Sequence, residues 1–324
     1  MRSKFLVLVA AGVVLASGCT PAEAPKPAAA AAPPAPAKPA GDVFTAKRGG
    51  FIPEGVEYDQ SNGRFLTGSL AEGTIFELKR DGSVVPFVTD PQLKSSVGIE
   101  VDEPRDRLLV ANSDSAAFQP GNVGQAKLGV YSLTTGERIA MVDLGAVIGT
   151  PKDPPQYFAN DLTVDGGGTV YVTDTMNNVV FKVTLDYQAS VLHRFTGLPQ
   201  GVQVNGIVYH DGGYLLVVAN EHIYKVPVAS PDATTEVSVN EPVPGQDGAV
   251  WAADGRLVVI SNSADAPRAV ALTSADDWLT ASRAAVATLV GQATTAAAVG
   301  NDIWVVHPHF MDADPPSFEQ AVFK

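Results

Sequence analysis

Four oxygen-bearing side chains recur at one position of an internal repeat. Six segments of the chain align, each with a short alternating strand, a turn rich in Gly, Asp or Asn, and a second strand rich in Val, Leu and Tyr. We call the residue just before the first strand of each segment its entrance residue. In order, the entrance residues are Glu54, Val97, Asn160, Asn205, Asp247 and either Thr294 or Thr295.

The chemistry that this set favours is the binding of a hard cation. Two carboxylates and two amides, with no thiol and no obligatory imidazole, suit Ca²⁺ or another divalent cation, because Ca²⁺ takes roughly six to eight oxygen ligands. The two carboxylates balance the charge, and water or substrate fills the other positions. A cation with an open position polarises a carbonyl or phosphoryl oxygen, which predicts hydrolysis.

Each entrance residue also has an interpretation without chemistry. Asn205-Gly206 and Asp247-Gly248 are common hairpin-turn dipeptides, Asn160-Asp161 suits a side-chain turn, and Glu54 suits a solvated strand end. However, each repeat already contains a turn between its first and second strands. The recurrence at equivalent points therefore favours a site.

The elements that must position these residues predict an all-β fold. A third and usually a fourth strand follow each aligned pair, and 274–283 is the one short helical candidate. Repeats of roughly 40 to 60 residues with four strands each are typical of a β-propeller, here with six blades. The last repeat lacks its outer strand. We expect residues 42–47 to supply it, so that the N-terminal strand completes the last blade and closes the ring.

The N-terminal region predicts export rather than a folded domain. A basic start and a short apolar run lead to small residues and Cys19, the single cysteine of the chain, so residues 1–18 read as a lipoprotein signal peptide. The segment 16–19 resembles a lipobox, and an ordinary secretory signal is the alternative. Residues 19–41 are rich in Ala and Pro and predict a flexible spacer before the propeller of 42–324. We expect a protein anchored in the bacterial envelope, in the periplasm or on the outer-membrane face, through a lipid on Cys19.

Charge limits the partners. The formal net charge is −13, which argues against nucleic-acid binding because phosphate contacts need a basic face. We expect a monomer whose partner is a small molecule and whose membrane contact is made only by the lipid.

The pattern resembles the SMP-30/gluconolactonase family of calcium-dependent lactonases and phosphotriesterases. Glu54-Gly55, Asn160-Asp161, Asn205-Gly206 and Asp247-Gly248 occur in that family's order over about 43–324. The resemblance implies that Glu54, Asn160, Asn205 and Asp247 hold the catalytic metal and that Asp247 acts as general base or nucleophile.

Two departures point to a different substrate within that family. Val56-Glu57-Tyr58 replaces the usual Pro and aromatic residue after Glu-Gly, and Phe158 stands where sugar-lactone members carry an Arg. Without that guanidinium, a more apolar lactone or ester is favoured.

Two long segments and a histidine pair predict the rest of the binding face. The loops 112–126 and 145–159 are rich in Pro and Gly, and we expect Phe118, Tyr157 and Phe158 to line a substrate pocket. His307 and His309 follow a strand of the last repeat; His307 is a candidate acid–base partner and His309 a pocket residue. The alternative for the two loops is a surface loop without a function, and the alternative for the histidines is a polar rim.

Two functions remain open from the sequence. The first is a metal-dependent, envelope-anchored hydrolase of lactones or related esters. The alternative is a non-catalytic propeller lipoprotein that binds a ligand or protein, because propellers host both kinds of function.

Overall fold

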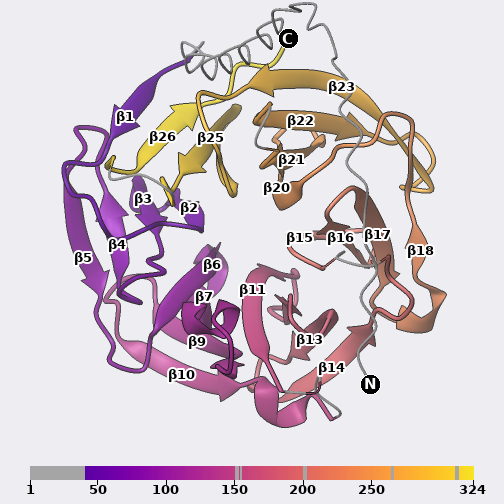
Figure 1. Ribbon diagram of the computed structural model, residues 1–324, viewed down its shortest axis with the longest axis horizontal. Helices are drawn as coiled ribbons and strands as arrows, with labels where there is room; N and C mark the ends of the chain where they lie inside the picture. The colour runs from indigo at the N-terminus through magenta and orange to yellow at the C-terminus, as the bar shows by residue number, and fades with distance from the viewer. Residues whose placement is uncertain (1–40, 150–152, 154, 200–202, 264–265, 311–313) are drawn as a thin grey trace, which may run out of the picture. The chain divides into compact units, whose positions relative to one another are not determined.

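Six β-sheets arranged around a central axis form the folded part of the chain (Figure 1). The computed structural model describes residues 41–149, 153, 155–199, 203–263, 266–310 and 314–324. The predicted signal peptide and almost all of the spacer lie outside the described residues. Among the described residues, no helix is long and apolar enough to cross a membrane.

Each sheet corresponds to one predicted repeat, and its main strands run outward from the axis in chain order, with β1 as the outer strand of the sixth sheet. Two short strands extend blades 3 and 5: β8 (Gly124–Gln125) lies beside β11, and β19 (Ser238–Val239) lies outside β23. Blade 1 contains β2 (Val56–Asp59), β3 (Arg64–Thr67), β4 (Ile75–Leu78) and β5 (Val84–Val88). Blade 2 contains β6 (Ser95–Asp102), β7 (Arg107–Ser113), β9 (Lys127–Ser132) and β10 (Arg138–Asp143). Blade 3 contains β11 (Tyr157–Val164), β12 (Val170–Asp174), β13 (Val179–Val183) and β14 (Ala189–Arg194). Blades 4 and 5 contain β15 (Ile207–His210), β16 (Tyr214–Ala219), β17 (His222–Pro227) and β18 (Thr235–Glu236); and β20 (Gln246–Trp251), β21 (Leu257–Ser261), β22 (Arg268–Thr273) and β23 (Thr280–Thr288). The predicted all-β propeller with six blades is confirmed.

The sixth sheet joins strands from both ends of the chain. It contains β24 (Ala296–Val299), β25 (Asp302–His307) and β26 (Ser317–Gln320), and β1 (Val43–Thr45) pairs antiparallel with β26 as its outer strand. Phe44 of β1 stacks on Phe318 with ring centroids 5.1 Å apart and also contacts Trp304 at 5.6 Å. Figure 1 shows β1 beside β26 at the edge of this blade.

The hydrophobic core lies between neighbouring blades. Buried side chains of one sheet pack against those of the next around the ring; Trp304 and Phe318 of blade 6, for example, share a cluster with Phe65 and Phe76 of blade 1. Burial of both faces of every sheet explains the Val- and Leu-rich second strands, because a strand covered on both sides reads as a continuous apolar run.

The short helical candidate at 274–283 does not form a helix. The segment forms a turn that leads into β23, and Asp277 and Trp278 have left-handed φ values of 58° and 60°. The side chain of Asp276 accepts hydrogen bonds from the backbone N–H and the hydroxyl of Thr280. These side-chain hydrogen bonds compete with the backbone hydrogen bonds of a helix. Trp278 is buried and packs edge-on against Trp251.

Candidate functional site

The entrance residues of blades 4, 5, 6 and 1 are joined by a row of hydrogen bonds. The Nδ2 of Asn205 donates to Oδ1 of Asp247 at 2.8 Å, and Gly248 N donates to the Thr294 carbonyl at 2.7 Å. The Thr294 hydroxyl in turn donates to the Glu54 carbonyl at 2.7 Å. These bonds place the side chains of Asn205 and Asp247 in contact and connect Glu54 through its backbone carbonyl. They also identify Thr294 as the entrance residue of blade 6.

The hairpin-turn interpretation of Asn205-Gly206 and Asp247-Gly248 is wrong. Neither glycine has the positive φ of a hairpin-turn glycine. Instead, a Cβ at Gly206 would lie 2.6 Å from the Asp247 carbonyl oxygen, and one at Gly248 would lie 2.2 Å from Thr295 Oγ1. Glycine follows the entrance residue because neighbouring blades approach too closely at the axis for a side chain.

Local irregularity of the inner strands helps to aim the entrance residues. In blades 2, 3 and 5 the entrance residue does not precede the strand, as the repeat suggested, but lies within it at a β-bulge. The pairing of β11 with β12 shifts between Ala159 and Leu162, and that of β20 with β21 shifts between Gln246 and Ala249. A bulge re-orients the side chains it contains, so Asn160 and Asp247 leave the regular alternation of their strands.

Asn160 carries an unsatisfied oxygen. Its Nδ2 donates to Thr175 Oγ1 at 2.8 Å, whereas its Oδ1 is buried without a hydrogen-bond partner in the described part of the chain. The residue after it, Asp161, accepts a hydrogen bond from Ile207 N at 3.2 Å, next to Asn205. A buried acceptor that lacks a donor costs about 1–3 kcal/mol, and a bound ion or water would supply the missing partner.

The carboxyl groups of this region perturb one another. Burial, the neighbouring Asp247 and then Asp161 raise the pKa of Glu54 well above its ordinary value. Burial raises the pKa of Asp247 to about 6, although hydrogen bonds from Asn262 and Asn205 oppose that rise. Crowded carboxyl groups in a partly desolvated channel would be relieved by a cation, so the residues fit the expected ligand chemistry.

The fit rests on two carboxylates and two amides rather than on an acidic or histidine cluster. Among the residues that the structure describes, no group of three or more His, Cys, Asp or Glu side chains lies close enough to hold a metal ion. A site here would therefore depend on the amide oxygens of Asn160 and Asn205 as well as on Glu54 and Asp247.

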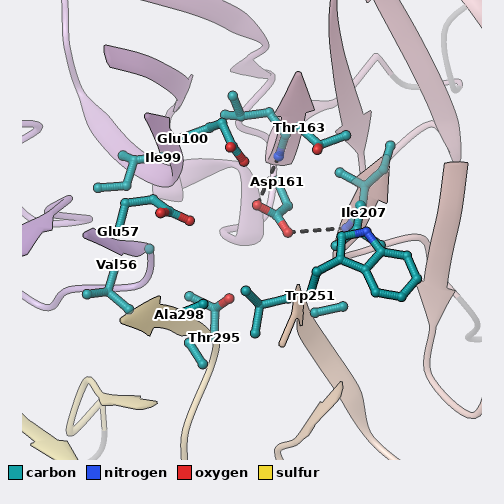
Figure 2. A pocket seen from close by; sticks show the side chains of 16 residues that line it. Val56, Glu57, Ile99, Glu100, Asp161, Thr163, Ile207, Trp251, Thr295 and Ala298 are labelled. Atoms are coloured by element: carbon teal, nitrogen blue, oxygen red, sulfur yellow. Dashed lines mark hydrogen bonds between the residues drawn. The ribbon is translucent and has the colours of Figure 1, made fainter. Parts of the chain in front are cut away.

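Further along the channel lies a cavity that the sequence analysis missed. It has a volume of about 190 Å³ and is lined by residues that follow the entrance residues in the inner strands. Figure 2 shows the carboxyl groups of Glu57, Glu100 and Asp161 turned into it, with Trp251 on the other side. A signal was present, because Glu57 and Glu100 stand three residues after Glu54 and Val97, at the same position of the repeat.

These carboxyl groups are held in a form that resists ionisation. Burial raises the pKa of Glu57 to about 8 and that of Asp161 to about 7. Burial, and then the charges of Glu57 and Asp161, raise the pKa of Glu100 well above its ordinary value.

The raised pKa of Glu57 predicts a pH-dependent gain in stability from Glu57→Gln. Because the folded-state pKa lies above the unfolded value of 4.5, ionisation of Glu57 destabilises the wild type progressively between pH 4.5 and about 8. We expect the variant and the wild type to melt together near pH 4.5. The variant should melt several degrees higher at pH 8, and the gain should level off above that pH. A difference independent of pH across thermal melts would contradict the raised pKa, and Glu137→Gln at an exposed position is the control.

The predicted pocket wall divides into exposed and buried parts. Phe118 is 56% exposed and contacts Phe158 edge-on at 4.8 Å, but Phe158 is only 4% exposed and belongs to the core between blades 2 and 3. Tyr157 is half-buried, and β8 (Gly124–Gln125) pairs in parallel with Tyr157 and Phe158. Phe158 thus supports Phe118 from below, and Phe118 is the residue of the three that mainly faces solvent.

The two histidines contact residues of blade 6. His307 is 2% exposed, and its ring nitrogens contact the Gln292 carbonyl at 3.0 Å and Glu319 Oε2 at 3.1 Å. Both nitrogens are therefore engaged inside blade 6, which favours a structural role over the predicted acid–base role. His309 is half-buried and contacts Ser317 Oγ at 3.4 Å.

Comparison with known proteins supports the fold and leaves the reaction open. No family model matches the sequence, and none of the curated proteins matches it significantly. The structure is similar to regucalcin, a calcium-binding protein from Agrobacterium tumefaciens, with a TM-score of 0.62 and 16% identity over 87% of this chain and 95% of that one. It is also similar to a gluconolactonase from Xanthomonas campestris, with a TM-score of 0.59 and 12% identity over 86% and 89% of the two chains.

A third solved structure carries a different activity on the same fold. Virginiamycin B lyase from Staphylococcus aureus has a TM-score of 0.55 and 12% identity, over 87% of this chain and 99% of that one. The resemblance expected from the entrance residues is thus confirmed for the fold. At these identities the reaction has to be argued from the site.

Proposed function

We propose that the protein is a divalent-cation-dependent hydrolase of lactones or related esters, with Ca²⁺ as the first candidate cation. The observation that carries the proposal is the joined set of Glu54, Asn205 and Asp247, together with the unsatisfied buried oxygen of Asn160. Glu54, Asn160, Asn205 and Asp247 would hold the cation. When bound, the cation would polarise the substrate carbonyl and stabilise the developing oxyanion.

Asp247 is the residue best placed for proton transfer or attack. Its carboxylate is oriented by two amide donors, with Asn205 Nδ2 at 2.8 Å from Oδ1 and Asn262 Nδ2 at 3.1 Å from Oδ2. Burial raises its pKa to about 6 without a cation, and a bound cation would favour the ionised form that a general base or nucleophile needs. Asp247 would accept a proton from the attacking water, or attack the carbonyl itself.

The surroundings favour an apolar substrate. Phe158 replaces the Arg of sugar-lactone members, and it supports the exposed ring of Phe118 on the adjoining loop. An apolar acyl or aryl group would pack on Phe118, whereas a heavily hydroxylated sugar lactone would lack its guanidinium partner.

The proposed location in the bacterial envelope rests on the sequence of residues 1–41. The lipobox-like segment that ends at Cys19 supports lipidation, and the Ala/Pro-rich spacer would separate the propeller from the membrane. The protein would act as a monomer on a small molecule.

A panel of lactones, aryl esters and phosphotriesters, assayed with Ca²⁺ and then with chelator, tests the proposed activity. We expect chelator-sensitive turnover that is highest for apolar lactones or esters. Asp247→Asn should lower kcat by about 10²- to 10⁴-fold, the usual contribution of a general base. The control is Asp254→Asn, because Asp254 lies on the surface.

Absence of chelator-sensitive turnover on every substrate would overturn the hydrolase. The second candidate, a non-catalytic binding propeller, would then be favoured. The altered residues Val56-Glu57-Tyr58 and Phe158 already point in that direction.

A further inference from the structure

Asn262 contacts Asp247 although it is not an entrance residue. It follows the last residue of β21, and its backbone N–H donates to the Gly245 carbonyl at 2.8 Å. Its Nδ2 donates to Asp247 Oδ2 at 3.1 Å, on the carboxylate oxygen opposite to the one that Asn205 contacts. Both the backbone and the side chain of Asn262 are therefore fixed at the proposed cation site.

The other end of the same amide, Oδ1, is buried and accepts no hydrogen bond from the residues that the structure describes. Because Oδ1 and Nδ2 are bonded to one carbon, this oxygen belongs to the same amide group that contacts the Asp247 carboxylate. Both Asp247 oxygens have amide donors, whereas Asn262 Oδ1 has none. Exchanging the amide oxygen and nitrogen would bring an oxygen against Asp247 Oδ2 and leave a buried N–H unsatisfied, so a flipped amide does not remove the conflict.

Asn160 shows the same combination. Its Nδ2 donates to Thr175, and its Oδ1 is buried and has no hydrogen-bond donor among the described residues. Two asparagines of the site thus hold their nitrogens on neighbouring side chains and leave an oxygen unsatisfied. A buried carbonyl oxygen next to a carboxylate is stabilised by a hard cation, whose coordination shell has more positions than four entrance residues fill.

We propose that Asn262 is a fifth protein ligand of the cation, in addition to Glu54, Asn160, Asn205 and Asp247. This inference rests on the proposed cation site and adds a residue to it. Nδ2 of Asn262 holds Asp247 in place, and Oδ1 provides the additional oxygen. A site with five protein oxygens favours Ca²⁺ over Mg²⁺, because Ca²⁺ accepts more ligands in looser geometry, whereas Mg²⁺ keeps several of its waters.

Calorimetric titration of the chelator-treated protein with Ca²⁺, and separately with Mg²⁺, tests this assignment without using activity. Asn262→Leu removes the oxygen and keeps the approximate size, and we expect at least a tenfold loss of Ca²⁺ affinity with a smaller change for Mg²⁺. Asn262→Asp provides a carboxylate oxygen, and we expect Ca²⁺ affinity to be maintained or increased. Without the ion, this variant should melt lower than the wild type, because the introduced carboxylate would repel Asp247.

Matched controls come from Asn240, an exposed residue next to the outer strand β19 (Ser238–Val239) of the same blade. Asn240→Leu and Asn240→Asp make the same chemical changes away from the axis and should leave both affinities unchanged. Wild-type Ca²⁺ affinity in Asn262→Leu would overturn the assignment and indicate a buried water at Oδ1. A loss in Asn262→Asp equal to that in Asn262→Leu would also overturn it, because only the Nδ2 donor would then matter.

Failure of this inference is distinguishable from failure of the proposed function. If the wild type takes up Ca²⁺ and Glu54→Gln does not, the cation site stands whatever Asn262→Leu shows. If the wild type takes up no cation, the site and the fifth ligand are both wrong. Should Asn262→Leu fail to fold, Asn262→Asp and Asn262→Ser, which retain an oxygen, decide by their Ca²⁺ to Mg²⁺ affinity ratios.

Discussion

Calcium should raise the melting temperature of the wild-type protein by several degrees, and Glu54→Gln should remove most of that increase. Glu54 and Asp247 each carry a raised pKa, and for Glu54 burial and the charge of Asp247 are the leading causes. A cation that binds only the folded form stabilises it by about 2.7 kcal/mol at a hundredfold excess over Kd. The Gln side chain keeps the size and one oxygen but removes one of two ligand charges, so we expect at least a tenfold loss in affinity.

Differential scanning calorimetry with and without Ca²⁺ measures this effect, and isothermal titration gives the affinities. The control is Glu137→Gln, which removes a charge at an exposed position and should respond to Ca²⁺ as the wild type does. If Glu54→Gln and the wild type show the same response, or if neither takes up Ca²⁺, Glu54 is no ligand and the carboxylate is only a strand-end residue.

Deleting residues 42–47 should lower the melting temperature strongly and reduce solubility. The deletion removes β1, whose residues Val43, Phe44 and Thr45 pair with β26. It also removes the Phe44 ring from its contacts with Phe318, Trp304 and Phe65. Loss of the strand leaves the edge of β26 unpaired, and exposed edges promote association between molecules.

Two point variants separate side-chain packing from strand pairing. Phe44→Ala should cost about 2 kcal/mol, below the usual range for a fully buried Phe because this ring is only half-buried. Val43→Ala on the same strand should cost little, because Val43 is 38% exposed. A truncated protein with an unchanged melting temperature would show that β1 contributes nothing to closing the ring.

Much of the candidate site follows from the repeat, because a repeat fixes equivalent positions without knowledge of their contacts. Aligning the six segments placed Glu54, Asn160, Asn205 and Asp247 at one position, and hydrogen bonds now join the entrance residues of four consecutive blades. The glycine that follows three of them was misleading by itself. A glycine after Asn or Asp suggests a hairpin turn from the local sequence alone. Here glycine is needed because the next blade approaches too closely for a side chain.

Other roles depended on burial, which the loop sequences do not reveal. Phe158 and His307 have residue types that suit a binding face, yet Phe158 packs in the core and His307 contacts Glu319 inside blade 6. Loop composition predicts exposure only on average, and both residues lie in strands: Phe158 in β11, where it pairs with β8, and His307 at the end of β25.

Strand alternation and turn chemistry act over a few neighbouring residues, so the strands, the number of blades and the four entrance residues could be predicted from the sequence. The contacts between side chains depended on the folded arrangement of the strands. Asn262 reaches Asp247 from the end of the adjacent strand of the same blade, and Glu57, Glu100 and Asp161 converge on one cavity from three blades. Those distances depend on the bulges and on the packing of neighbouring sheets around the ring, which bring together residues that are far apart in the chain.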